Sequence, residues 1–357
     1  MRRAAEVNEA RIAVVGAGQI GRRHIEEISK NPGATISAIV DPMQGAAALA
    51  RRVGRPLYDT LEACITADRP DGVVLATPNR LHVPQGLACI AAGIPVLIEK
   101  PLAHDLDEGE RLVAAAEKVG ARVLVGHHRL YSPLLRRTVE AVRAGILGRI
   151  VGVIGSAVFY KPDAYFDGPN TWRREPGAGP LLINMIHEIG NLRAMVGEIA
   201  AVQAVASNAV RGFPIEDTVA VTLRFVDGAL GTFLLSDTAA SARSWEQTSR
   251  ENDAYPTYPD EDAYTILGTE GSLAVPSLRL KRYAKLESRS WFEPFACDTL
   301  PVERADPLAE QITHFVAVIR GEATPLVSAR DGLQNLRVVD AIMRAARAGG
   351  TVEVPAG

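Results

Sequence analysis

The stretch RIAVVGAGQIG, residues 11–21, decides the fold of the first part of this chain. An apolar run typical of a buried strand leads directly into a G-x-G-x-x-G triplet, and an amphipathic stretch follows. Gly16 permits the tight turn, Gly18 lets a phosphate approach the backbone, and Gly21 lets strand and helix pack closely. This arrangement predicts a dinucleotide-binding loop, because the free N–H groups at a helix N-terminus attract phosphate.

The same region indicates which dinucleotide binds. Gln19 and Ile20 begin the helix whose N-terminus is expected to meet the pyrophosphate. Asp41 ends the second predicted strand twenty residues after Gly21, where a carboxylate accepts a hydrogen bond from a ribose 2′-hydroxyl. Asp41 would repel a 2′-phosphate, and Pro42 stands where a phosphate-binding arginine could lie. We therefore predict NAD as the cofactor and regard NADP as the less favoured alternative.

Four more apolar runs follow before His128, and they are rich in Val and Ile at successive positions. Such runs are typical of parallel strands covered on both faces, and the amphipathic stretches between them favour a doubly wound sheet. Strands are expected at 11–18, 34–41, 72–78, 95–101 and 121–128, and helices at 20–29, 43–54, 60–67, 82–93 and 105–120.

Polar residues follow three of these strands, at the edge of the sheet where open α/β sheets bind ligands. Lys100 comes directly after an apolar run, so its ammonium is expected beside the nicotinamide. The alternative for this residue is an ordinary surface lysine. The residues assigned to the cofactor crevice at the strand ends are Thr77, Pro78, Asn79, His82, Glu99, Lys100 and Arg129.

The pattern changes after about Tyr131, where strands with period-two alternation predominate. Alternation predicts a mostly antiparallel sheet with one face on helices and one face open. We therefore expect a loose tail at 1–10, an NAD-binding Rossmann domain at 11–128, and a substrate-binding and oligomerisation α/β domain at 129–357. The second domain is expected to contain helices at 132–145, 181–197, 307–320 and 330–347, and strands at 148–160, 201–210, 217–236, 263–275 and 278–285.

The composition excludes several classes of protein. With 357 residues, 47% hydrophobic and 23% charged, the chain resembles ordinary soluble proteins of two domains. Its 39 Lys and Arg against 42 Asp and Glu give no basic surface for nucleic acid or membrane. We find no secretory signal and no membrane-spanning stretch, and so expect a cytoplasmic protein. No group of residues, including the three cysteines, has the spacing of a metal site.

These residues resemble the Gfo/Idh/MocA family, named for glucose–fructose oxidoreductase and inositol dehydrogenase. The resemblance covers nearly the whole chain and implies a Rossmann domain followed by an α/β domain whose open sheet packs on another subunit, giving a homodimer or homotetramer. It rests on GAGQIG (16–21), ATPNRLH (76–82), EKP (99–101), Trp172-Arg173, EPGAGPLLINMIH (175–187) and HFVAVIRGEATPLVSARDGLQNL (314–336).

The resemblance also implies roles for individual residues. Lys100 matches the family's EKP lysine, and His187 its usual acid/base partner on a helix, so both are expected around one substrate hydroxyl. Trp172, Arg173 and Arg129 match residues near the cofactor. The family often has an aspartate four residues before this histidine. Here Ile183 occupies that position and Asn184 follows it, so we expect Asn184 to orient a substrate hydroxyl.

Two further stretches contain candidates for binding a carbohydrate. The long polar segment 241–264 carries Trp245, Asn252, Tyr255 and Tyr258, and a predicted strand ends with Tyr160 and Lys161 just before another loop. Long loops often determine specificity, and aromatic rings stack on sugars. The alternatives for the segment are an oligomer contact or a plain connection.

The sequence thus predicts an NAD-dependent oxidoreductase that transfers hydride between nicotinamide and a secondary alcohol of a sugar, polyol or inositol-like substrate. Removing the hydroxyl proton requires a base near neutral pKa. His187 meets this requirement without perturbation, whereas Lys100 would need burial or a neighbouring positive charge to lower its pKa. One alternative is an NAD-using glycoside hydrolase or lyase with transient oxidation, in which Glu188 or Glu175 would serve as the extra acid. The other is a non-catalytic NAD-binding regulator.

Overall fold

The computed structural model describes residues 9–175 and 178–357. The chain divides into two compact units: the first contains the residues up to His128, 307–336 and Gly357, and the second contains 129–306 with 337–356. Most of the tail expected at 1–10 lies outside the described residues. The segment 307–336, which we expected in the second domain, belongs to the first unit.

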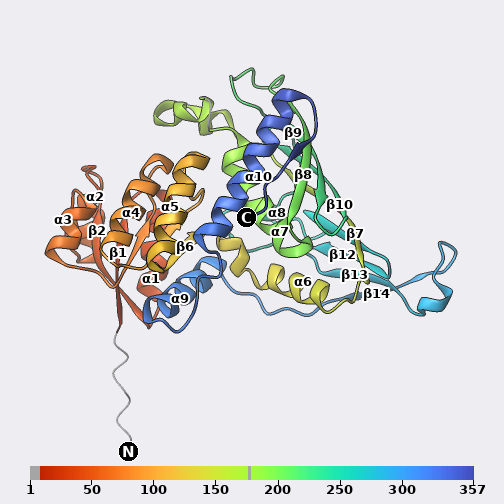
Figure 1. The fold of residues 1–357 in the computed structure, drawn as a ribbon, viewed down its shortest axis with the longest axis horizontal. Coiled ribbons are helices and arrows are strands. Elements are labelled where there is room, and N and C mark those ends of the chain that lie inside the picture. Colours follow the sequence, from red (N-terminus) through yellow and green to blue (C-terminus); the bar gives the residue numbers. More distant parts are fainter. Residues whose placement is uncertain (1–8, 176–177) are drawn as a thin grey trace, which may run out of the picture. The chain divides into compact units, whose positions relative to one another are not determined.

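The first unit contains a six-stranded parallel sheet in the order β3-β2-β1-β4-β5-β6, of which Figure 1 labels β2, β1 and β6. The strand order reverses between β1 and β4: β2 and β3 are added on one side of β1, and β4, β5 and β6 on the other. In open α/β sheets, ligands bind at such a switch point, beyond the carboxyl ends of the strands. This sheet confirms the predicted Rossmann fold. Its strands are β1 (Ala10–Val15), β2 (Ala34–Val40), β3 (Leu57–Tyr58), β4 (Gly72–Leu75), β5 (Val96–Glu99) and β6 (Val123–Gly126).

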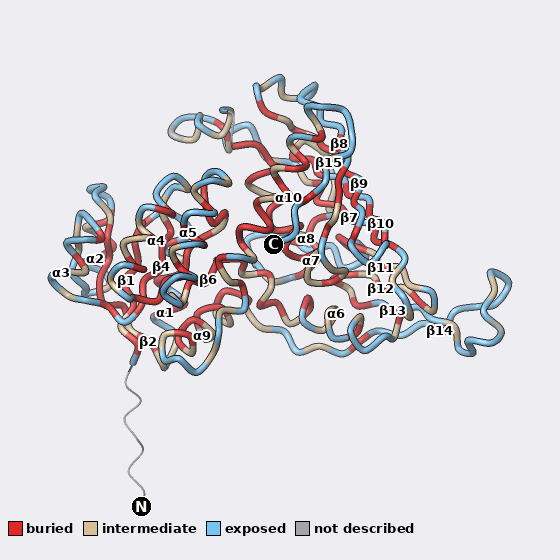
Figure 2. The backbone as a smooth tube through the Cα atoms, viewed as in Figure 1, coloured by how far each residue is buried: buried red, intermediate tan, exposed pale blue. Residues whose placement is uncertain are grey.

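Helices cover this sheet because its strands are apolar on both faces, and Figure 2 shows buried residues along them. Helix α1 contacts β1 and β2, α4 contacts β4 and β5, and α9 packs against α1 and β1. The contacts of α9 explain why residues 307–320 join this unit. The helices are α1 (Gln19–Lys30), α2 (Ala46–Val53), α3 (Leu61–Ala67), α4 (His82–Ala91), α5 (Leu106–Val119) and α9 (Pro307–Arg320).

The second unit contains a nine-stranded sheet in the order β14-β13-β12-β11-β7-β10-β9-β8-β15. Its neighbouring strands are antiparallel except for β7 and β10, which confirms the mostly antiparallel sheet. The strands are β7 (Ile150–Val158), β8 (Ile199–Ser207), β9 (Thr218–Phe225), β10 (Leu230–Ser236), β11 (Tyr264–Gly268), β12 (Gly271–Val275), β13 (Arg279–Tyr283), β14 (Phe295–Thr299) and β15 (Val352–Glu353).

One face of this sheet packs on helices and the other is open. Along β9, Val221 and Leu223 are buried while Thr222 and Arg224 are exposed, as the alternating pattern predicts. Helix α7 contacts β7, and α6 contacts both α7 and β12. The remaining helices are α6 (Pro133–Arg143), the π-helical turn η5 (Leu181–Met185), α7 (Ile186–Val196), α8 (Trp245–Thr248) and α10 (Ala329–Ala348), whose first eight residues belong to the first unit.

Three strands, β3, β14 and β15, were not predicted. β3 and β15 have two residues each, too few to show a period. All five residues of β14 are exposed, as Figure 2 shows, so no face of it carries a buried apolar pattern. Within the described residues, no helix is both long enough and apolar enough to cross a bilayer.

Candidate functional site

The predicted G-x-G-x-x-G loop follows β1, and its three glycines have different surroundings. Gly16 has a φ of +95°, and a Cβ built on it would lie 2.5 Å from the carbonyl oxygen of Ala76. A Cβ on Gly21 would lie 1.9 Å from the carbonyl oxygen of Gly16, whereas one on Gly18 would meet no atom within 4 Å. Packing therefore requires Gly16 and Gly21, while Gly18 leaves open the space that a closely approaching phosphate needs.

The N-terminus of α1 is suited to an anion. Gly18 is its N-cap, no side chain among the described residues caps this end, and its first turn, with Gln19 and Ile20 exposed, holds no acidic residue. The N–H groups of this turn and the helix dipole therefore attract negative charge. Asp41 lies beside the loop and accepts hydrogen bonds from the N–H groups of Ala17 (2.7 Å) and Met43 (2.8 Å). These donors and this carboxylate fit the pyrophosphate and a ribose hydroxyl of a dinucleotide.

Glu99 anchors the turn that carries Lys100. It is 6% exposed, and its Oε1 lies 2.7 Å from Nε2 of His24 in α1. Its other oxygen accepts a hydrogen bond of 3.2 Å from the backbone N–H of Lys100. Burial would raise the pKa of Glu99, but the hydrogen bond and charge of His24, with the charges of His128 and Lys100, lower it overall. Glu99 thus fixes the start of the turn, and Lys100 itself is partly exposed.

His82 joins two of the predicted strand-end loops. Its Nδ1 lies 2.8 Å from the carbonyl oxygen of Pro101, and its Nε2 lies 2.9 Å from that of Thr77. Burial lowers the pKa of His82, while the two carbonyl contacts oppose this shift. Thr77 donates a further hydrogen bond to Gln85, and Pro78 and Asn79 begin the short helical turn that leads into α4. The strand ends after β4 and β5 are therefore linked as a single polar edge.

In the second unit, Asn184 and His187 lie within one turn of each other where η5 continues into α7. π-Helical turns are rare and occur frequently at functional sites. Asn184 is half-buried and its Oδ1 accepts a hydrogen bond of 2.8 Å from Nζ of Lys161, whereas His187 is 8% exposed. Lys161 also lies 3.4 Å from Asp237, which pairs with Arg211. We call Lys161, Asn184, Arg211 and Asp237 the Lys161 cluster.

Arg129, which the resemblance places near the cofactor, is buried in a network of charges within the second unit. It donates to Glu188 (2.6 Å) and Glu246 (2.8 Å), and Tyr264 donates its hydroxyl to Glu188. Burial would lower the pKa of Arg129, but the two carboxylates raise it well above the ordinary value. Glu188 directly follows His187, so this Arg129 network (Arg129, Glu188, Glu246 and Tyr264) holds the helix that carries the histidine.

The aromatic candidates differ in exposure. Trp245 is 1% exposed and donates its indole N–H to Glu251 (2.9 Å), so its ring is not accessible for stacking on a sugar. Tyr160 and Trp172 are 56% and 54% exposed. The guanidinium of Arg173 lies 3.8 Å from the ring centre of Tyr165. Trp245 is therefore an anchor of its loop, and Tyr160 keeps a surface that a ligand can reach.

Sequence reasoning missed Arg211, Asp237, Glu246 and Tyr264. Their partners are distant in sequence: 117 residues separate Arg129 from Glu246. No local pattern marks such pairs, since only the fold brings them together. Lys161 was recognisable only by its place after a predicted strand.

Two family models match this chain. A model described as "Oxidoreductase family, NAD-binding Rossmann fold" matches residues 10–127, and one described as "Oxidoreductase family, C-terminal alpha/beta domain" matches residues 139–354. Together they cover both units apart from short connecting and terminal segments.

Curated relatives and solved structures agree with these matches. A 1,5-anhydro-D-fructose reductase of Ensifer adhaerens is 28% identical over 97% of this chain and 99% of its own. An inositol 2-dehydrogenase of Rubrobacter xylanophilus is 28% identical over 96% of this chain and 92% of its own. The WlbA dehydrogenase of Bordetella pertussis, solved with NADH and UDP-GlcNAcA, is 26% identical with a TM-score of 0.77, over 98% of this chain and all of its own.

Proposed function

This chain belongs to the Gfo/Idh/MocA family of oxidoreductases and is an NAD(P)-dependent dehydrogenase, and we propose that it oxidises a secondary alcohol of a sugar, polyol or inositol-like substrate. The relatives that match over nearly their whole length are named for anhydrofructose and inositol, and both are polyhydroxylated rings. Two observations carry the proposal. In the first unit, Gly18 leaves open space at the N-terminus of α1, which no side chain among the described residues caps. In the second unit, His187 lies one helical turn from Asn184 of the Lys161 cluster.

We propose NAD rather than NADP as the cofactor. Asp41 is held beside the glycine loop by two backbone N–H groups, so its charge is fixed where the adenosine ribose is expected. A 2′-phosphate there would meet a carboxylate and be repelled. The residues proposed to contact the cofactor, in addition to the loop, are Asp41, Thr77, Pro78, Asn79, His82, Glu99, Lys100, Trp172 and Arg173.

Lys100 and His187 are the proposed proton-handling residues. The nicotinamide of bound NAD would supply the acceptor for the hydride on the carbinol carbon of the substrate. Lys100 donates a hydrogen bond to the hydroxyl oxygen and stabilises the charge that develops as the O–H bond breaks. His187 takes the hydroxyl proton, for which an imidazole is suited near neutral pH. Asn184 orients a neighbouring polar group of the substrate, and Tyr160 contributes an exposed ring.

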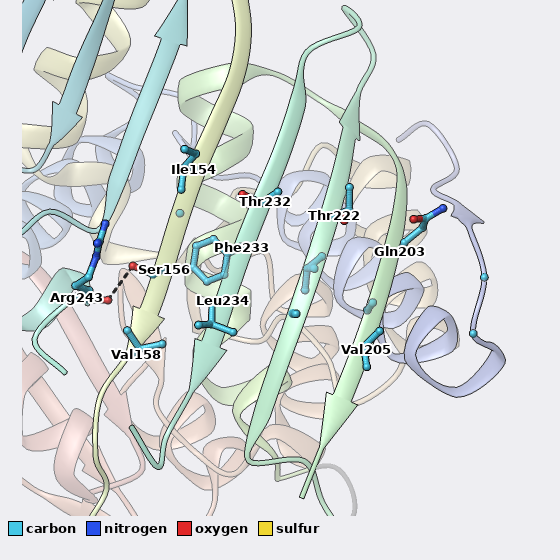
Figure 3. A pocket seen from close by; sticks show the side chains of 16 residues that line it. Ile154, Ser156, Val158, Gln203, Val205, Thr222, Thr232, Phe233, Leu234 and Arg243 are labelled. Carbon is cyan, nitrogen blue, oxygen red and sulfur yellow. Dashed lines mark hydrogen bonds between the residues drawn. The ribbon is translucent and has the colours of Figure 1, made fainter. Parts of the chain in front are cut away.

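The open face of the second sheet is the proposed contact with another copy of the chain. Figure 3 shows side chains of β7, β10, β9 and β8 standing on this face, including Ile154, Thr232, Thr222 and Gln203 in one row. They line a shallow hollow of about 690 Å³. Exposed Ile154 (51%), Leu234 (45%) and Val205 (75%) lie on it, and apolar surface of this kind favours association. A homodimer or homotetramer would cover it.

Formation of reduced nicotinamide by the purified protein tests the proposed activity. The protein is given NAD and a panel of sugars, inositols and sugar acids, and absorbance reports the NADH formed. We expect a signal with at least one compound and a loss of about 10³-fold in Lys100→Ala, typical of a lost proton-handling group. A wild-type protein that binds NAD and reduces none of it would contradict the proposal, and an equal signal in Lys100→Ala would remove Lys100 from it.

A further inference from the structure

Strand β14 forms one edge of the nine-stranded sheet, and one side of its backbone has no neighbouring strand among the described residues. The other side pairs with β13, and just beyond this pair the N–H of Leu300 donates to the carbonyl oxygen of Leu278 (3.0 Å). Backbone groups of successive residues point to opposite sides of an antiparallel strand. Counting back from Leu300, the N–H and carbonyl groups of Phe295, Cys297 and Thr299 therefore point outward, away from β13.

The outward side of β14 lacks the features that usually protect a sheet edge from other chains. Natural edge strands often carry lysine, proline or a bulge. The sequence of β14 is FACDT, and its register with β13 runs without interruption from Phe295 to Thr299. Its one charged side chain, Asp298, accepts a hydrogen bond from the N–H of Thr299 (2.7 Å), which is a local contact that a strand can replace. All five residues are exposed, as Figure 2 shows, so the edge is open to a further strand.

The same strand of a second copy fits this edge. In an antiparallel pair related by a two-fold axis perpendicular to the sheet, one residue faces its own counterpart and the others pair symmetrically about it. With Cys297 at the centre, Phe295 faces Thr299 of the partner subunit, so the outward groups of all three residues meet outward groups. Asp298 then faces Ala296. With Asp298 at the centre, two carboxylates would face each other, which is unfavourable.

The loop before β14 adds two exposed aromatic rings to this edge. Residues 284–294 connect β13 to β14, and in Figure 1 this light-blue loop extends beyond the β14 label. Trp291 and Phe292 are 88% and 85% exposed, and their ring centres lie 5.6 Å apart. Because paired β14 strands run in opposite directions, the loop of each copy reaches past the end of β14 in the other.

Covering these rings gives the contact a substantial area. An aromatic side chain buries about 150–250 Å² when it is fully covered. Four rings, two from each copy, thus bury up to about 600–1,000 Å², compared with about 1,600 Å² in a typical stable interface. The paired strands supply further area and hydrogen bonds. A peptide of another protein would pair with the strand without bringing a second pair of rings, so these features favour a second copy.

We propose that β14 pairs with β14 of a second copy across a two-fold axis at Cys297, so that two nine-stranded sheets continue as one. This contact uses an edge of the sheet, whereas the open-face contact proposed above uses side chains of β7, β8, β9 and β10. The two contacts involve different residues, so one can fail while the other remains. A chain that uses both assembles beyond a dimer.

Cys297 itself reports on this pairing. It is exposed, while Cys64 and Cys89 are buried. In the proposed register the Cα atoms of the two Cys297 residues lie about 5.5 Å apart. A short bis-maleimide, which takes up one thiol at each end, should therefore link wild-type chains into covalent dimers. The control is Cys297→Ser combined with Lys118→Cys, because Lys118 is an exposed residue of α5. It should give at least about tenfold less dimer, since only paired thiols have a high effective concentration.

Association without a cross-linker tests the aromatic loop. Sedimentation velocity over a dilution series compares wild type, the double variant Trp291→Ser with Phe292→Ser, and the control Val119→Ser, which changes an exposed apolar residue of α5. The double variant should weaken one association step about tenfold or more and reduce the Cys297 cross-link by a similar factor. Val119→Ser should change neither. If thermal unfolding shows that the double variant does not fold, Cys297→Pro replaces it in sedimentation, because it removes an outward N–H and none that β13 uses.

Three results would overturn the inference. The first is a wild-type protein that the bis-maleimide links no faster than the Lys118→Cys control, although a simple maleimide labels both. The second is association that the loop variant leaves unchanged, or that Val119→Ser weakens equally. The third is a wild-type Cys297 that is protected from the simple maleimide while the chains sediment as monomers, which would show that another molecule covers the edge.

Discussion

The glycine loop of the first unit is built from backbone groups, whereas the Lys161 cluster and the Arg129 network of the second unit are built from buried charged side chains. In the loop, backbone carbonyl oxygens and N–H groups define the space available to a phosphate. The glycines contribute by having no side chain, which leaves that space open. In the second unit, each buried charge depends on a partner that is distant in sequence. The first region thus suits a common cofactor, and the second offers contacts that can differ from one substrate to another.

The largest expected effect on stability comes from a substitution that breaks the Arg129 network. Arg129→Met leaves Glu188, which is 1% exposed, without its cationic partner, and removing one member of a buried pair typically costs about 3–5 kcal/mol. The control is Arg224→Met, because Arg224 pairs with Glu353 at the surface and should contribute less than about 1 kcal/mol. Urea unfolding measures both. Equal small losses would show that the network is not held by its charges.

The next largest effect is expected in the glycine loop, where the result of adding a Cβ depends on which glycine receives it. Gly21→Ala places a Cβ 1.9 Å from the carbonyl oxygen of Gly16 and should lower stability by about 3 kcal/mol. Gly18→Ala meets no atom within 4 Å, so it should leave the unfolding midpoint nearly unchanged while weakening NAD binding about tenfold or more. Calorimetry and NAD titration separate the two. A Gly18→Ala protein that binds NAD normally would contradict the role given to the open space.

Asp41→Ala tests the side chain to which we assign the proposed selectivity for NAD. Removing the carboxylate should weaken NAD and relieve the repulsion of a 2′-phosphate, so the ratio of the NADP to NAD dissociation constants should fall about tenfold or more. Fluorescence titration of both dinucleotides gives this ratio. An unchanged ratio would remove Asp41 as the selective residue.

The smallest expected effect depends on pH. Burial raises the pKa of Glu251 to about 7, although Ser132 and Trp245 donate hydrogen bonds to it. The folded protein therefore binds this proton more tightly than the unfolded chain, and the resulting stability is complete below about pH 4.5 and lost as the pH rises through about 7. Glu251→Gln, which resembles the protonated acid, should retain about 1–2 kcal/mol that wild type loses by about pH 8.

Unfolding curves of both proteins between about pH 5 and pH 8 measure this difference. The two curves should approach each other at the acid end, where Glu251 is protonated. A constant difference across the range would show that Glu251 does not titrate there.

The sequence predicted the fold and the cofactor loop because their determinants are local. Gly16, Gly18 and Gly21 lie within six residues, and the strands of the first unit are continuous apolar runs. Long-range packing decided the rest. Residues 307–336 join the first unit through contacts of α9 that no local pattern encodes. Trp245 was a candidate for sugar stacking because the sequence around it is polar, but its ring is buried beside Tyr264.

Hydride transfer in a single turnover tests the proposed dehydrogenase activity without relying on repeated cycles. The protein is mixed with equimolar NAD and sugars, inositols and sugar acids deuterated on their carbinol carbons, and the dinucleotide is analysed by mass spectrometry. We expect reduced nicotinamide carrying one deuterium in wild type and almost none in Lys100→Ala and His187→Ala. Dinucleotide that binds wild-type protein but gains no deuterium from any of these compounds would contradict it.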